Sequence, residues 1–160
     1  MRLRPALAVV AVVLVTASCA PTVDLSKGIE VVDVSTGWHD AGIVDGKNKL
    51  VPSVTFRFKN KSDQKLGALQ ANVVFRHVSD DKEWSSFFVK VTGSDGLAPG
   101  ATSDSQRVNA PLGYTGTEAR LEMLQNSHFE DAKAQVFAKY GSTQWARVGE
   151  YPVERQLLEK

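Results

Sequence analysis

The sequence has a single cysteine, almost no net charge and no hydrophobic run long enough to cross a bilayer as a helix. Cys19 is the only cysteine among 160 residues, so a disulfide within the chain is excluded. The 19 basic residues nearly match the 18 acidic ones, which argues against a polybasic nucleic-acid binder. At 42% hydrophobic and 23% charged residues, the composition is typical of one compact domain rather than of a disordered chain.

Sequence patterns of catalytic and metal sites are also missing. There is no Gly-x-Ser-x-Gly turn for a serine nucleophile, and no glycine-rich phosphate loop joins a strand to a helix. Ser127 and His128 are adjacent, and sequence neighbours point in different directions, which argues against a catalytic dyad. His39, His77 and His128 occur singly, without the spacing of zinc ligands. We therefore expect no enzyme, no cofactor and no transition-metal site.

The acidic segment 40–46 has two interpretations. Asp40 and Asp45 flank Gly42, and Gly46 follows Asp45, but the acids do not alternate as they do in calcium loops. A calcium ion bridging loops at one end of the domain is the less favoured interpretation, and a solvated turn is the more favoured one.

The first 18 residues have the organisation of an export signal. Arg2 and Arg4 precede an apolar stretch at 5–15, which ends in small residues. The stretch has about ten apolar residues, whereas a membrane-spanning helix needs roughly 20, so a cleaved signal is favoured over a permanent anchor.

Cys19 directly follows the small residues of this signal. Thr16-Ala17-Ser18-Cys19 resembles the lipobox of bacterial lipoprotein precursors, with threonine where leucine is commoner. The resemblance implies that Cys19 becomes the mature N-terminus and receives a diacylglycerol thioether and an N-acyl chain. Two or three acyl chains would anchor the protein stably. The alternative is an ordinary secretory signal cut near Ala20, with an incidental cysteine.

Three expectations about location follow from this resemblance. Ala20, in place of aspartate, resembles the sorting pattern for the outer membrane in cells with two membranes. Residues 19–28 would form the lipidated tether, in which 20–28 span at most about 30 Å when extended. Loss of both signal arginines leaves 17 basic against 18 acidic residues, a net charge of −1, which gives no reason for the domain to bind anionic lipid.

Strict alternation of apolar and polar residues dominates the chain after Ile29. In 52–60, for example, Val54, Phe56 and Phe58 share one face of a half-buried strand. About seven strands are predicted, at 29–34, 52–60, 69–76, 86–92, 102–109, 133–140 and 144–154. Only 117–125, with Thr117 as its N-cap, resembles a short helix, so parallel βαβ units are disfavoured.

These features predict an all-β, two-sheet antiparallel sandwich of immunoglobulin type over 29–160, with one short helical insert. Pro152 removes a backbone donor and places the last strand at a sheet edge. The order of signals over 50–110 resembles bacterial immunoglobulin-like lipoprotein domains. The residues that carry this resemblance are Val54 to Asn60, Val73 to Phe75, and the Leu-x-Pro-Gly turn from Leu97 to Gly100. It implies an architecture and no chemistry, and the function of such domains is uncharacterised.

Aromatic residues are the candidates for a binding surface. Trp38, Trp84, Trp145 and Tyr114 lie near predicted strand ends or loops, where they could stack on sugars or contact a peptide. The alternative is that each tryptophan fills one end of the core. Three apolar residues lie on the outward faces of predicted strands: Val74, Phe88 and Phe137. Either the 111–130 segment covers them or they form an exposed patch for association.

The sequence therefore predicts a noncatalytic, lipid-anchored envelope protein. Its partners would be the membrane, through acyl chains on Cys19, and an unidentified envelope protein or polymer. The alternative is a carbohydrate- or small-ligand-binding module that uses the loop-end aromatic residues.

Overall fold

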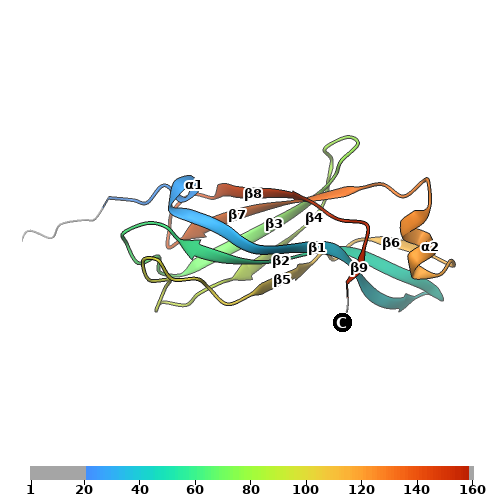
Figure 1. Ribbon diagram of the computed structural model, residues 1–160, viewed down its shortest axis with the longest axis horizontal. Coiled ribbons are helices and arrows are strands. Elements are labelled where there is room, and N and C mark those ends of the chain that lie inside the picture. Colours follow the sequence, from blue (N-terminus) through green and yellow to red (C-terminus); the bar gives the residue numbers. More distant parts are fainter. Residues whose placement is uncertain (1–20, 159–160) are drawn as a thin grey trace, which may run out of the picture.

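The computed structural model describes residues 21–158, which form nine strands and two short helices. In chain order these are α1 (Leu25–Gly28), β1 (Ile29–Val44), β2 (Lys47–Asn60), β3 (Leu69–His77), β4 (Glu83–Lys90), β5 (Gln106–Asn109), β6 (Tyr114–Gly116), α2 (Arg120–Gln125), β7 (Ala132–Tyr140), β8 (Ala146–Pro152) and β9 (Leu157–Leu158). Figure 1 shows an elongated body, with α1 near one end and α2 near the other.

The strands form two sheets packed as a sandwich. One has the order β5-β2-β1-β9, with β6 also beside β2, and the other has the order β4-β3-β7-β8. The runs β1-β2-β5 and β4-β3-β7-β8 correspond to strands A-B-E and C′-C-F-G of an immunoglobulin-like fold. Every pair is antiparallel except β1 with β9. The predicted all-β sandwich is confirmed, and β6 and β9 are additions to the predicted strands.

The core lies between the sheets and follows the alternation in the sequence. Val54, Phe56 and Phe58 of β2 are fully buried. Val73 of β3 and Val136 of β7 are fully buried in the opposite sheet and are directly paired. The apolar faces of both sheets are thereby removed from water, which is the main stabilising contribution to such a fold.

A buried asparagine fixes two loops at the α1 end. The side-chain amide of Asn60, the last residue of β2, donates to the carbonyl oxygens of Gln64 at 2.8 Å and Leu97 at 2.9 Å. Its side-chain oxygen accepts from the backbone N–H of Ser62 at 2.9 Å and from the Ser62 hydroxyl at 2.7 Å. The polar group is therefore buried with its hydrogen bonds satisfied.

Strand β1 is ten residues longer than the predicted strand at 29–34, because it continues to Val44. The ladder with β2 is irregular between Val32 and Ser35 and again between Asp40 and Ile43. Asp33, at φ 52°, and Gly42, at φ 87°, have left-handed backbone at these two places. Each bulge interrupts the alternation, which is why the sequence pattern ends early.

The acidic segment 40–46 is the end of β1 and a two-residue hairpin turn. Val44 pairs with Lys47, and the two turn residues, Asp45 and Gly46, both have positive φ, as a tight hairpin requires. The Asp40 carboxylate contacts the Arg120 Nε at 2.7 Å and accepts the Gly42 N–H at 2.9 Å. The segment is therefore the turn that was favoured over a calcium loop.

The C-terminal strands differ from the prediction in extent. Strand β8 ends at Pro152 and lies at the edge of its sheet, so the edge position inferred from this proline is confirmed. The chain then crosses to the other sheet and adds β9 to β1. The hydroxyl of Thr36 holds this crossing, since it donates to the Pro152 carbonyl at 2.9 Å and accepts the Glu154 N–H at 3.1 Å.

The helical insert lies within the predicted range 117–125 but is shorter than predicted. Helix α2 begins at Arg120 rather than near 117, and its N-cap is Ala119, which makes no side-chain cap bond. Segment 111–130 lies at the end of the sandwich, beside the β1–β2 hairpin (Figure 1), where Asn48 donates to the Glu118 carbonyl. The expectation that it covers the outward apolar residues is therefore wrong. Among these, Phe88 is 51% exposed, Phe137 is half-buried and Val74 is buried.

Residues 21–28, which belong to the predicted tether 19–28, are packed on the domain. The backbone N–H of Val23 donates to the Tyr140 hydroxyl at 2.7 Å, and Leu25 of α1 is buried. The Gln64 side chain donates to the Pro21 carbonyl at 2.9 Å. The predicted signal 1–18, Cys19 and Ala20 lie outside the described residues.

Candidate functional site

The four aromatic candidates occupy two separate places. Trp38, Trp84 and Tyr114 meet in one cluster with Phe129, whereas Trp145 lies near α1. Only Trp145, at 39% exposed, is among the exposed large apolar residues. A single surface formed by all four is therefore not present, and the expectation of one is corrected.

Trp38 is the centre of the aromatic cluster and is fully buried. Its ring centroid lies 4.5 Å from that of Phe129, 5.7 Å from that of Tyr114 and 6.0 Å from that of Trp84. Its backbone lies inside the sheet, between β2 and β9, and its side chain is covered by these three rings. Trp38 therefore fills the core, as the alternative interpretation proposed, and cannot contact a ligand.

Tyr114 and Trp84 are half-buried on the flanks of this cluster. The Tyr114 hydroxyl accepts the backbone N–H of Glu130 at 3.1 Å and lies 3.3 Å from the Glu130 carbonyl, to which it donates. Burial raises the pKa of Tyr114 above its usual value. The Trp84 ring lies 5.0 Å from that of Tyr114 and stacks at 4.6 Å on His77. Both aromatic residues thus join the sheets to the segment around α2.

A pocket of about 160 Å³ lies beside Tyr114. Its lining combines part of β6 with the segment around α2, and the residues are Tyr114, Thr115, Gly116, Glu118, Met123, Asn126, His128 and Phe129. Neither Trp38 nor Trp84 lines it. The pocket has room for a small group but offers no tryptophan as a stacking platform.

The histidines lie apart and have local contacts. His77 Nδ1 lies 2.9 Å from the Glu130 carboxylate. The backbone N–H of His128 donates to the Asn126 side chain, which places the exposed Ser127-His128 pair in a turn. His39 is half-buried on β1. Within residues 21–158, no three of the possible metal-binding side chains gather at one point.

Trp145 lies across the outer face of the β4-β3-β7-β8 sheet. It immediately precedes β8, yet its ring centroid is 6.1 Å from that of Phe88 on β4, at the opposite edge of the sheet. The Lys139 ammonium sits 5.2 Å from the centre of the indole ring. A further pocket, of about 470 Å³, separates residues 22–25 from residues 142–146, so Trp145 is close to the N-terminal segment. Of the four candidates, Trp145 is the one whose ring lies on the surface.

Four exposed apolar side chains that the sequence analysis did not single out gather at the opposite end. Ile43 and Val44 belong to the β1–β2 hairpin, Leu112 precedes β6, and Leu121 belongs to α2. These four residues, which we call the distal tip, come from segments that are adjacent at the α2 end (Figure 1). An Ile-Val pair immediately before an Asp-Gly turn was the signal available in the sequence.

Comparisons with known proteins add the following. No family model matches the chain, and no curated protein matches it. Solved structures similar to it include one described as "X-ray structure of Northeast Structural Genomics Consortium target SoR45", at 14% identity and a TM-score of 0.46. That match covers 81% of this chain and 88% of the other. Within residues 21–158, neither helix is long and apolar enough to cross a membrane.

Proposed function

We propose that this chain is a lipid-anchored, noncatalytic module of a bacterial envelope, which holds another envelope protein at its distal tip. The single observation that carries the proposal is that the two ends of the elongated domain differ (Figure 1). Cys19, in its lipobox-like setting, lies two residues before Pro21 at one end, and the exposed apolar tip lies at the other. Ala20 after the cysteine supports a location on the periplasmic face of the outer membrane in a cell with two membranes.

The chemistry of the tip favours a protein rather than a glycan polymer as the partner. Ile43 is 70% exposed and Leu121 is 59% exposed, and aliphatic side chains gain free energy by burial against another apolar surface. Glycan polymers are bound mainly by aromatic stacking and polar groups, and the buried Trp38 is not accessible for this.

A noncatalytic role is supported by the structural use of the polar groups around the cluster. The Arg155 guanidinium contacts the Asp131 carboxylate at 2.6 Å and donates to the Phe129 carbonyl at 2.8 Å. It therefore ties the crossing after β8 to the segment that follows α2. His77 is stacked on Trp84 and pairs with Glu130 in a similar supporting role.

The anchor is tested by Cys19→Ala in the producing cell. We expect the wild-type protein to be acylated, to stay with membranes and to accumulate as a precursor under globomycin. The variant should lack the acyl mass and leave the membrane fraction. An unchanged mature mass together with unchanged membrane retention would exclude lipidation.

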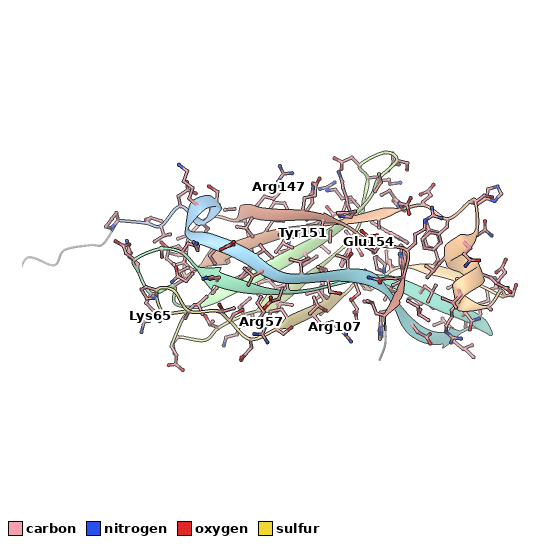
Figure 2. The ribbon with its side chains drawn as sticks, viewed as in Figure 1. Arg57, Lys65, Arg107, Arg147, Tyr151 and Glu154 are labelled. Atoms are coloured by element: carbon pink, nitrogen blue, oxygen red, sulfur yellow. The ribbon has the colours of Figure 1, made fainter. Side chains whose placement is uncertain are left out.

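The tip is tested by photo-crosslinking in intact cells from a photoreactive amino acid at Ile43 or Leu121. The matched control is Lys65, an exposed residue near the anchor end (Figure 2). We expect the same protein adduct from both tip positions, none from Lys65, and loss of the Leu121 adduct when Ile43→Lys is added. Equal adducts from Lys65 and the tip would contradict the proposal.

The ligand-binding alternative has weaker support. Its remaining site is the pocket beside Tyr114, and its original tryptophan surface is divided between a buried residue and a distant one. A fluorescence screen against glycans tests it, because a ligand in this pocket would alter the emission of Trp84, 5.0 Å from Tyr114.

A further inference from the structure

The outer face of the β4-β3-β7-β8 sheet is basic and aromatic in the half nearest the N-terminal segment. Pairing places Lys90, Gln70 and Lys139 in one row across the sheet, and Phe88, Asn72, Phe137 and Arg147 in the next. Trp145 lies over these rows, in contact with Phe88 and Lys139. We call Lys90, Lys139, Arg147, Phe88, Phe137 and Trp145 the proximal face. Its two rows contain three cations and no carboxylate, and of these cations Arg147 also lies 3.5 Å from the Glu150 carboxylate of the adjoining row.

From these rows we infer that the proximal face docks on an anionic lipid surface. This inference rests on the proposed lipidation of Cys19 and specifies how the anchored domain sits on the membrane. Tryptophan and long basic side chains are the residues that favour the membrane interface, since each combines an apolar body with a polar end. Each lysine or arginine near an anionic surface strengthens binding about fivefold.

The position of the anchor brings the proximal face to the lipid. Cys19 is two residues from Pro21, a span of at most about 7 Å. Val23 is bonded to Tyr140, which directly follows Lys139 in β7. An acylated Cys19 would therefore hold the bilayer surface close to this face at high effective concentration, where even weak attraction is sufficient for docking.

Carboxylates limit the part of this sheet face that can contact an anionic lipid surface. In the far half of the same face, the Glu150 carboxylate lies 3.8 Å from the Lys133 ammonium, and Asp81 lies 2.7 Å from it. Glu83 lies 3.7 Å from Arg76. These carboxylates balance the cations there and would be repelled by anionic headgroups. The domain would thus lean on its proximal face and leave the distal tip free for a partner.

The single cysteine makes a direct test possible. A chain beginning at Cys19 retains the whole core, which runs from Leu25 to Val153, and is coupled through Cys19 to a maleimide lipid in vesicles. The vesicles contain lipids brominated near the headgroup end of the acyl chain, with or without 30% phosphatidylglycerol. We expect tryptophan quenching that depends on phosphatidylglycerol and disappears in Trp145→Phe. Trp38 is fully buried, and Trp84 packs on His77 and Tyr114, outside the proximal face.

Charge reversal supplies the matched comparison. Lys139→Glu with Arg147→Glu should reduce the ratio of docked to undocked protein by roughly 5- to 25-fold, because the attraction of Lys139 is removed in full and that of Arg147, which Glu150 already weakens, in part. The control is Arg57→Glu with Arg107→Glu, which has the same charge change on the other sheet. Figure 2 shows Arg57 and Arg107 projecting from the side opposite Arg147. Circular dichroism melts verify that all variants are folded.

The outcomes separate the inference from the proposal that it extends. Quenching that is insensitive to phosphatidylglycerol, or is lost equally in both reversal variants, would overturn docking by this face. Chemical coupling does not depend on cellular acylation, so that result is independent of the Cys19→Ala test. A soluble mature protein in cells would instead refute the lipid anchor and, with it, the biological setting of the docking.

Discussion

Replacement of Trp38 by alanine tests whether this tryptophan is a core residue or a binding residue. The side chain is fully buried, and its ring packs on those of Phe129, Tyr114 and Trp84. Truncation of a buried aromatic residue leaves a cavity and lowers the free energy of unfolding by about 3–5 kcal/mol. The described domain, 21–158, has 138 residues, for which 1 kcal/mol corresponds to roughly 3.4 °C in the melting temperature. We therefore expect Trp38→Ala to lower the melting temperature by roughly 10–17 °C.

Two further variants make this prediction specific. The indole N–H of Trp38 is buried without a partner among the described residues, so Trp38→Phe loses no hydrogen bond and should cost roughly half as much or less. Trp145→Ala removes an exposed ring with one cation–π contact and should cost about 1 kcal/mol at most. Urea unfolding followed by far-ultraviolet circular dichroism measures all three variants without relying on tryptophan emission. The reasoning fails if Trp38→Ala costs no more than Trp145→Ala.

Three other predictions follow from single contacts. Asn60→Ala should lower the free energy of unfolding by about 2–4 kcal/mol in urea titrations, because two loop carbonyls and one N–H lose their buried partner. A loss below about 0.5 kcal/mol would contradict this. Gly113→Ala should cost about 1–3 kcal/mol, since its Cβ would collide with the carbonyl oxygen of Leu50, whereas Gly93→Ala, with open space around it, is the near-neutral control. Burial raises the pKa of Tyr114, so the stability contribution of the neutral phenol is complete below pH ~10 and is lost as pH rises through the folded-state pKa. The difference in melting temperature between wild type and Tyr114→Phe should therefore be constant below pH ~10, where it reports the lost hydroxyl contacts, and should change only above pH ~10. A difference that already changes with pH near neutrality would contradict this cause.

The signals that predicted the fold are local. Alternation in β2, β3 and β7 places Val54, Val73 and Val136 on buried faces, because successive side chains of any strand point to opposite sides. The edge position of Pro152 was equally readable, since proline lacks the N–H that a neighbouring strand would need. The early end predicted for β1 shows the limit of such signals, because a bulge at Asp33 changes the period without a recognisable residue pattern.

The candidate sites depended on contacts between distant segments. Whether Trp38 is exposed is decided by Phe129 and Tyr114, whose rings cover it and which lie about 90 and 75 residues further along the chain. The near-zero net charge gave no reason to expect lipid binding by the domain, yet strand pairing brings Lys90, Lys139 and Arg147 to adjacent rows of one face.

The sequence by itself thus determined the all-β class, the buried face of each regular strand and the lipobox-like setting of Cys19, since each depends on residues within a few positions of one another. The tertiary structure alone decided which aromatic residues reach the surface and where the charges gather. The physical reason is that burial and local electrostatic potential are properties of neighbours in space, and sheet pairing makes neighbours of segments that are far apart in the chain.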